Sequence, residues 1–157
     1  MRIEKEEFEK TVDRYSDALL RSVYTYCHDI DDAKDIVQET FIKYLKTAPD
    51  LIDEKHRKAW LLRTAINLAK DQTSSFWATK RSKMQETADD SEPDPMLGCE
   101  IWLLVSQLPA KDRLVIELYY REDCTLAQIA EITGSKPSTI ASRLEKARKR
   151  LKKMYNS

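Results

Sequence analysis

The sequence predicts an all-α protein made of two small helical domains joined by an acidic linker. Glycine is scarce, with two in 157 residues, and runs of β-branched residues are short, so little favours strands. Elsewhere apolar residues recur at steps of three and four, as on one face of a helix. Residues 84–99 instead combine two prolines and Gly98 with acidic groups that repel one another, which predicts a flexible linker. We therefore expect domains at residues 1–83 and 100–157.

Three helices are expected in the first domain. Five apolar or aromatic residues line one side of the first helix, at steps of four, three, four and four. They are Phe8, Val12, Tyr15, Leu19 and Val23. The second helix follows a cluster of acids, which suit the positive end of a helix dipole, and stops before Pro49. Its expected inner side comprises Ala33, Ile36, Val37, Thr40, Phe41, Tyr44 and Leu45. The third runs from Lys58 to Lys83 without Gly or Pro, and its expected inner side comprises Trp60, Leu61, Thr64 and Leu68.

Four shorter helical patterns make up the second domain. Apolar stripes mark the first two, and Pro109 fits the first position of the second of these helices. The stripes comprise Ile101, Leu104, Val105 and Leu108, then Leu114, Val115, Leu118 and Tyr119. Thr125 stands three residues before Gln128, the capping-box spacing that begins a helix. Gly134 can end that helix in the left-handed conformation, and Pro137 marks the first turn of the last helix.

The last two helices have the spacing of a helix-turn-helix. Ala130 offers a small side chain where two helices approach, Gly134 stands at the turn, and Ile140 plugs the second helix against the first. The opposite face of the last helix carries hydroxyls and cations, which suit base edges and phosphates in a major groove. That face comprises Ser138, Thr139, Ser142, Arg143 and Lys146. The alternative is a solvated basic helix that packs on a partner.

Charge is segregated along the chain, although 27 basic and 27 acidic residues cancel. Residues 57–85 carry seven basic groups and one acidic group, and residues 136–157 carry eight and one. Residues 86–100, between them, carry six acidic groups and no basic one. Two separated cationic surfaces suit a polyanion that is contacted at two places. Nucleic acid is therefore the expected partner.

The sequence points away from several other classes of protein. No apolar run approaches the ~20 residues of a membrane-spanning helix, and the start lacks the pattern of a secretory signal. Cys27 beside His28 could suggest a metal, but no second pair stands at ligand spacing, and the three cysteines are too scattered for a disulfide framework. We therefore expect a cytoplasmic protein with no metal.

Several segments resemble the bacterial sigma-70 family, and most closely its small extracytoplasmic-function (ECF) group. DDAKDIVQETFIKYLK and KAWLLRTAINLAKD, at residues 31–46 and 58–71, are similar to the family's region 2. LPAKDRLVIELYYREDCTLAQIAEITGSKPSTIASRLEKARKRL, at residues 108–151, is similar to its region 4. The resemblance implies a subunit that binds core RNA polymerase, through the β′ clamp and the β subunit, and directs initiation at promoter DNA. It implies no catalytic residue, no cofactor and no small-molecule substrate.

The resemblance also assigns residues to three contacts. In the family, one face of the second helix docks on the polymerase clamp, and here it comprises Asp32, Asp35, Gln38 and Glu39. The contact with the −10 element, read after the strands separate, falls on Arg57, Lys58, Arg63, Asn67 and Lys70. The contact with the −35 element falls on Lys136, Ser138, Thr139, Ser142, Arg143 and Lys146. A solvated acidic face is the alternative for the first set.

Four residues depart from the family pattern. Phe76 and Trp77 stand where relatives are more often basic, and they could stack on unpaired bases, pack under an anti-sigma factor or complete the domain. Ala141 and Glu145 replace residues that are often basic or larger on the recognition helix. An anti-sigma factor, which is membrane-anchored for many relatives, is a further expected partner.

Two other functions compete with the sigma-factor interpretation. A helix-turn-helix regulator would have a sensing or interaction domain at its N-terminus, with a ligand pocket or a dimer seam in residues 1–80. A nuclease or recombinase would need acids that converge on a metal. Asp32, Asp35 and Glu39 lie along one helix without a supporting histidine, which disfavours that option.

Overall fold

Helices form all the regular secondary structure in the part of the chain that the structure describes, which confirms the all-α prediction. The computed structural model describes residues 3–51, 53–84 and 100–157, with side chains in these ranges except at 73–84. The predicted linker, apart from Met84, lies outside the described residues. The predictions for the side chains of Phe76 and Trp77 lie outside them as well.

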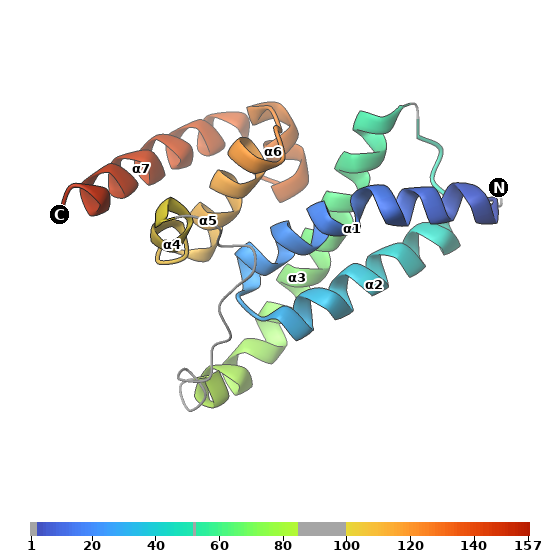
Figure 1. Ribbon diagram of the computed structural model, residues 1–157, viewed down its shortest axis with the longest axis horizontal. Coiled ribbons are helices and arrows are strands. Elements are labelled where there is room, and N and C mark those ends of the chain that lie inside the picture. The colour runs from blue at the N-terminus through green and yellow to red at the C-terminus, as the bar shows by residue number, and fades with distance from the viewer. Residues whose placement is uncertain (1–2, 52, 85–99) are drawn as a thin grey trace.

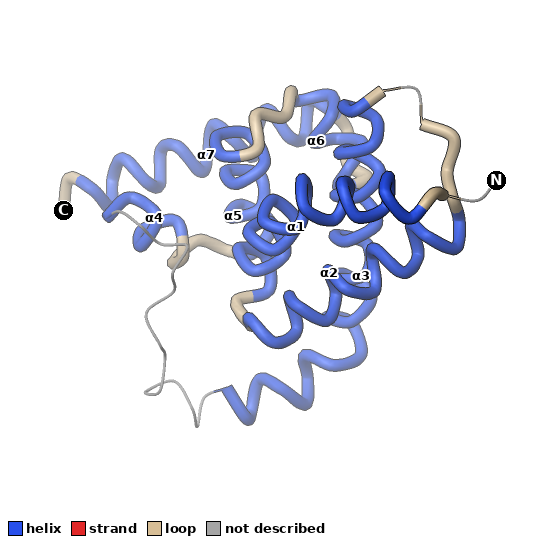
Figure 2. The backbone as a smooth tube through the Cα atoms, turned by 45° about the vertical axis from the view of Figure 1, so that its right-hand side comes forward, coloured by secondary structure: helices blue, strands red, loops and turns tan. Residues whose placement is uncertain are grey.

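Three helices build the first domain, and each packs on the other two (Figures 1 and 2). They are α1 (Lys5–Cys27), α2 (Ile30–Thr47) and α3 (Glu54–Met84). The backbone turns left-handed at His28 to end α1 and at Ala48 to end α2. Between them, the Asp29 side chain accepts a hydrogen bond from the Asp32 N–H at 3.0 Å and caps α2. Hydrogen bonds between near neighbours in the sequence therefore fix where these helices begin and end.

Four α-helices and one π-helical turn build the second domain. They are α4 (Glu100–Val105), α5 (Ala110–Ile116), η1 (Glu117–Arg121), α6 (Leu126–Thr133) and α7 (Pro137–Tyr155). The predicted capping box is present: Gln128 N–H donates to Thr125 Oγ1 at 3.1 Å, and Thr125 N–H donates to Gln128 Oε1 at 2.8 Å. Gly134 ends α6 at φ 77°. Pro109 differs slightly from its prediction, because it caps α5 instead of forming its first residue.

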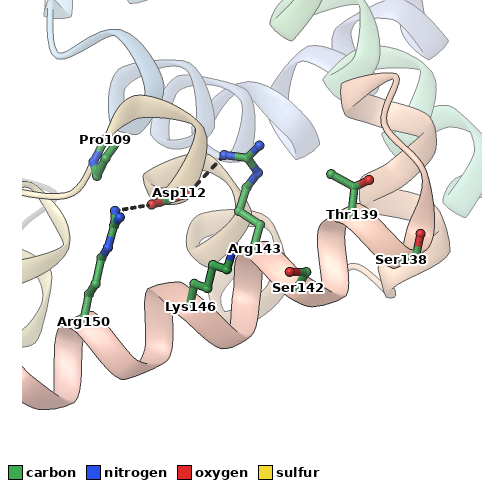
Figure 3. Close-up of a pocket in the computed structure, with 8 residues that line it drawn as sticks. All are labelled: Pro109, Asp112, Ser138, Thr139, Ser142, Arg143, Lys146 and Arg150. Atoms are coloured by element: carbon green, nitrogen blue, oxygen red, sulfur yellow. Dashed lines mark hydrogen bonds and ion pairs between the residues drawn. The ribbon is translucent and has the colours of Figure 1, made fainter.

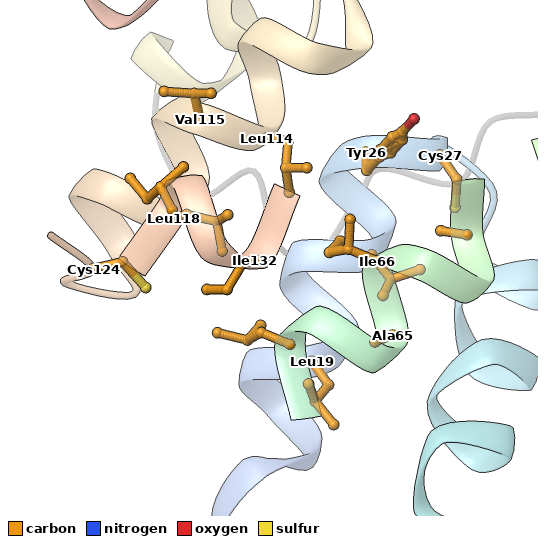
Figure 4. Close-up of a cluster of buried hydrophobic side chains, with 14 of the residues drawn as sticks. Leu19, Tyr26, Cys27, Ala65, Ile66, Leu114, Val115, Leu118, Cys124 and Ile132 are labelled. Carbon is orange, nitrogen blue, oxygen red and sulfur yellow. The ribbon is translucent and has the colours of Figure 1, made fainter. Parts of the chain in front are cut away.

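The two domains share one hydrophobic core. Helix α1 packs on α5 and η1, and α3 packs on α6. Figure 4 shows Leu19 and Ile66 of the first domain facing Leu114, Leu118 and Ile132 of the second, and all five are buried. Domains of this size bury little apolar surface alone, so each stabilises the other through this shared core.

Arg113 of α5 is a buried polar link between the domains. It is 9% exposed. Its Nε donates to Thr25 O at 2.7 Å and its Nη2 donates to Tyr26 O at 2.7 Å, while Nη1 donates to Leu108 O at 2.6 Å within its own domain. A cation at the carbonyl end of α1 is favourable because the helix dipole is negative there. Burial lowers the pKa of Arg113 from its ordinary value, but arginine stays protonated at physiological pH.

Some of the predicted inner faces are wrong in detail. Leu45 was expected in the core of α2 but is 46% exposed, and Ile101 of α4 is also exposed. On α3, Trp60, Thr64 and Leu68 are only half-buried. Among the described side chains of α3, the most buried are Leu61, Leu62, Ala65, Ile66 and Ala69. The difference arises because α3 packs on α1 and α2 on one side and on α6 on another, which widens and rotates its buried face.

Candidate functional site

A groove of about 570 Å³ runs along α7. Its wall on one side is the start of α5, and its floor is the outer face of α7 (Figure 3). The opposite face of α7 is buried through Ile140, Leu144 and Ala147, as predicted. Five of the six residues predicted to contact the −35 element line the groove: Ser138, Thr139, Ser142, Arg143 and Lys146. The structure therefore brings them together on one concave, basic surface.

Arg143 differs from the other four predicted residues in the groove. It is half-buried and turns toward α5, where its Nη1 lies 3.2 Å from Asp112 Oδ1 (Figure 3). Arg150, two helical turns further along α7, places its Nη1 3.1 Å from Asp112 Oδ2. Sequence reasoning had left both Asp112 and Arg150 out of this site. Their pairing depends on α5 packing beside α7, which neither helix shows in its own sequence.

Lys136 is the sixth predicted −35 residue, and it lies at the end of the groove. It occupies the N-cap of α7 with no side-chain hydrogen bond to the helix among the described residues. Its exposed ammonium lies before a helix N-terminus, where the backbone N–H groups favour an anion. A phosphate group suits that position.

The residues predicted to contact the −10 element follow α3 and differ in accessibility. Arg63 and Asn67 are exposed. Arg57 is half-buried and forms ion pairs with Glu54 and, at 3.2 Å, with Glu7. These pairs hold Arg57 against the first domain. Arg63 and Asn67 are therefore the more available members of this set.

The second domain covers part of the same surface. Lys58 Nζ donates to the Glu122 carbonyl oxygen at 3.0 Å and lies 3.8 Å from its carboxylate. Lys70 Nζ donates to the Thr133 carbonyl oxygen at the end of α6. Arg63 lines a cavity of about 250 Å³ together with residues of α6. Two of the predicted −10 cations thus bind the second domain in this structure.

Two buried acids of the second domain, Glu117 and Glu122, are paired with arginines near this boundary. Arg21 makes a two-point contact with Glu122, from Nε to Oε2 at 3.1 Å and from Nη2 to Oε1 at 3.2 Å. Glu117 is fully buried in η1, with Arg121 Nε 3.3 Å from its carboxylate. Burial raises the pKa of Glu117 to about 8, and the neighbouring Glu122 carboxyl acts in the same direction. Burial therefore favours the protonated form of Glu117.

An acidic face runs along α2 on the far side from its buried residues. Asp35, Gln38 and Glu39 are exposed, and Asp32 is half-buried in the first turn. Ala33, Ile36, Phe41 and Tyr44 occupy the buried side. The four predicted polymerase-contacting residues thus lie on the outer side of one helix. Such a surface suits a basic protein partner.

The acidic face continues into an apolar end that the sequence did not reveal. Ile42 and Leu45 are each 46% exposed and follow Gln38 at steps of four and three, so they extend the same side of α2. Exposed apolar groups rimmed by charges are typical of protein-binding surfaces. Leu45 had been predicted to lie on the buried side of α2, and only the packing shows that it is exposed.

In the described ranges, no three His, Cys, Asp or Glu side chains gather as a metal site. The same ranges contain no helix with the length and apolarity to cross a bilayer. Cys27 and Cys124 are free and buried, and burial raises the pKa of each thiol to about 11, which makes both poor nucleophiles.

Comparison with protein families gives two matches, in chain order. A family described as Sigma-70 region 2 matches residues 11–79, and one described as Sigma-70, region 4 matches residues 100–151. The first match contains α2 and most of α3, and the second contains α5, α6 and most of α7. Each candidate surface therefore lies inside a matched region.

Individual relatives agree over most of the chain. RNA polymerase sigma factor SigV of Bacillus subtilis (strain 168) is 30% identical over 133 residues, which cover 82% of this chain and 79% of SigV. ECF RNA polymerase sigma factor SigW of the same organism is 28% identical over 167 residues, covering 96% and 89%. Among solved structures, the sigma factor RpoE in complex with the anti-sigma factor NepR, from Bartonella quintana, has a TM-score of 0.69 at 22% identity. It covers 96% of this chain and 98% of that one, and the likeness concerns the fold.

Proposed function

The chain belongs to the sigma-70 family of RNA polymerase sigma factors, and from this premise we propose that it acts as an ECF-type sigma factor in the cytoplasm. It binds core RNA polymerase and directs transcription to promoters through contacts with −10 and −35 elements. It has no catalytic activity of its own. One observation carries the proposal: an acidic helix face and a basic helix-turn-helix groove stand on two domains of one chain, each inside the matching sigma-70 region.

The contacts divide between the two domains. The outer side of α2, with Asp35, Gln38 and Glu39 and the apolar Ile42 and Leu45, is the surface we assign to the polymerase clamp. Asp32 contributes at its edge. The charges steer association with a basic partner, and the apolar groups supply buried area once the partner is bound. The β subunit of the polymerase is the expected contact of the second domain.

The first domain reads the −10 element from α3. Asn67 is exposed, and its amide can both donate to and accept from the edge of an unpaired base. Exposed Arg63 and, once released, Lys58 and Lys70 bind phosphates of the opened strand. Arg57 positions the start of α3 through its ion pairs with Glu54 and Glu7.

The second domain reads the −35 element with the α7 groove. Its hydroxyls reach base edges, while Lys146 and the N-terminal Lys136 bind phosphates. This arrangement is preferred over the helix-turn-helix regulator because the N-terminal domain matches sigma-70 region 2.

The two domains must separate before the chain can contact both promoter elements at once. Elements about 25 base pairs apart are separated by roughly 85 Å of duplex, at 3.4 Å per base pair. A compact chain of this length has a radius of gyration of about 15 Å. The closed arrangement, in which the two domains pack on each other as in this structure, therefore cannot contact both elements. Opening also releases Lys58 and Lys70 from Glu122 and Thr133. On the polymerase, both domains are then held at a fixed distance, and the second DNA contact becomes nearly intramolecular.

A protein inhibitor that holds the closed form fits the same geometry. The similar RpoE structure contains the anti-sigma factor NepR. By that likeness we expect an anti-sigma factor for this chain, with membrane anchoring as one way to place it.

Reconstitution tests the proposal directly. The chain is added to purified core RNA polymerase with genomic DNA of the host, and transcript starts are mapped. New starts that share two spaced elements are expected. A charge reversal on the clamp face, Asp35→Lys, should abolish them, whereas Glu9→Lys on the exposed side of α1 should not. A chain that does not join the polymerase, or joins it without new starts, would refute the proposal.

A further inference from the structure

Asp112 is an acid in a groove that otherwise offers cations and hydroxyls to DNA. Among the eight described residues that line the groove, it is the sole carboxylate, alongside Arg143, Lys146 and Arg150. It is 7% exposed. A buried carboxylate beside a DNA-binding surface lowers the attraction for phosphates, so its presence requires a reason beyond charge.

The geometry supplies that reason, because one carboxylate fixes two arginines. Oδ1 pairs with Arg143 and Oδ2 pairs with Arg150, at 3.2 and 3.1 Å. The two arginines are seven residues apart on α7, which places their backbones about 10 Å apart along the helix axis. Figure 3 shows Asp112 between them, at the α5 wall of the groove.

Fixing the arginines before DNA binds lowers the entropy cost of the contact. A free arginine side chain loses much rotamer freedom when it binds a base, whereas Arg143 is already ordered by Asp112. The pair with Asp112 uses one terminal nitrogen of Arg143, and a guanidinium has further N–H donors that remain for a base edge.

The carboxylate also acts on the DNA backbone. Within the short range over which charges act in physiological salt, Asp112 repels any phosphate that lies at the α5 end of the groove. Binding is weakened when the DNA is positioned with a phosphate beside Asp112. It is not weakened when the DNA is positioned with a base edge there. Ordering of Arg143 and repulsion of phosphate therefore act in the same direction.

We propose that Asp112 is a specificity-determining positioning residue of the −35 contact, acting through Arg143. It raises discrimination between upstream sequences and lowers binding to unrelated DNA. This inference rests on the proposed function of the α7 groove as the −35 reader.

The test uses holoenzyme assembled from the full chain and core RNA polymerase. It is bound to duplexes that share one −10 element, taken from a start mapped with the wild-type chain, and carry a randomised upstream element. Sequencing of the bound fraction gives the base preference at each position. Binding to one unselected duplex over a range of KCl concentrations gives the salt dependence. The variants are Asp112→Asn, which keeps the shape and removes the charge, and Glu100→Gln, which makes the same charge change on α4.

With Asp112→Asn, preference at one position or two adjacent positions should fall about tenfold, the scale of one good base contact. Binding to the unselected duplex should strengthen, with a salt slope steeper by about one phosphate contact. Glu100→Gln should leave both unchanged. Lower thermal stability with wild-type base preference and salt slope would mean that Asp112 merely joins α5 to α7, and would overturn the inference. A wild-type holoenzyme that selects no upstream sequence would instead refute the proposed function.

A double-mutant cycle tests whether Asp112 acts through Arg143. Arg143→Lys should flatten preference at the same position, and adding Asp112→Asn should then change it little further. Additive losses would refute the proposed route. Arg150→Gln, at a more than half-exposed side chain, probes the same bridge with little risk to folding. It should relax preference at that position as well, and an unchanged preference would count against the bridge.

Discussion

Replacing Arg21 with Gln should loosen the closed arrangement of the two domains. Arg21 makes its two-point contact with Glu122, whose side chain is 1% exposed, while Arg21 itself is 32% exposed. Removing one partner of a buried ion pair costs about 3–5 kcal/mol. Solvent screening of the arginine reduces this to about 2–3 kcal/mol. Separation of the domains should therefore become about 30- to 150-fold more frequent, at about 1.4 kcal/mol per factor of ten.

Amide hydrogen exchange measures this separation. Helix α6 has eight residues and packs on α3 of the first domain and on α7 of the second. Opening of the domains leaves it packed on one side only, and a helix so short is then less stable. Exchange of α6 amides should accelerate in Arg21→Gln by about the same 30- to 150-fold, provided that they exchange through domain opening. Amides of α2 should exchange at the wild-type rate. Affinity for core polymerase should rise, because less free energy is spent on opening.

The matched control is Arg14→Gln, which makes the same substitution on α1. Arg14 is 65% exposed and pairs with Glu54 inside the first domain at 3.7 Å. It should leave α6 exchange unchanged. The reasoning is refuted if the two variants exchange alike at α6, or if Arg21→Gln accelerates α2 as much as α6, since the second outcome would mean global unfolding instead of separation.

Three further predictions concern the pH dependence of stability, the turn at Gly134 and the polymerase-contacting side of α2. Glu117 has a pKa of about 8 in the folded chain and about 4.3 when unfolded, so the folded state holds a proton that the unfolded state releases. The free energy of unfolding should therefore fall as pH rises from about 5 through 8, and Glu117→Gln should remove that part of the pH dependence. Urea unfolding midpoints of both proteins at pH 6 and 9 measure the effect. An equal change of midpoint with pH in the two proteins would contradict the prediction. Gly134→Ala should cost about 1 kcal/mol in urea unfolding, because φ is 77° although a Cβ would meet no described atom within 4 Å; no loss would contradict the left-handed turn. Leu45→Ala should weaken polymerase binding about tenfold and leave stability unchanged. Leu103→Ala, at a similarly exposed leucine on α4, should change neither polymerase binding nor stability. Equal effects of the two substitutions on binding would show that Leu45 is not in the interface.

Local chemistry explains why much of the fold could be predicted. The capping box of Thr125 and Gln128 and the turn at Gly134 involve residues within a few positions of each other. Their hydrogen bonds form wherever the surrounding tertiary structure allows a helix. The spacing of Ile140 and Leu144 likewise gives the buried side of α7, and so places the hydroxyls and Lys146 on the groove side. Those parts of the site follow from the sequence.

The direction of Leu45 could not be predicted in the same way. Apolar spacing shows that a helix has a buried side, but it does not give the width of that side. On α2 the buried side ends at Tyr44, and Leu45 is left exposed. On α3 the buried side is wider than its stripe, because α6 covers a surface that would face solvent in an isolated first domain.

The sequence by itself determined the helical fold, the two ends of α6, the helix-turn-helix and the family. Tertiary structure alone decided that the domains close on each other, that Glu122 receives Arg21 and Lys58, and that Asp112 bridges Arg143 and Arg150. The physical reason is sequence distance. These partners lie 31 to 101 positions apart, and a buried charge acquires its partner only when packing brings two distant helices together, which no local periodicity encodes.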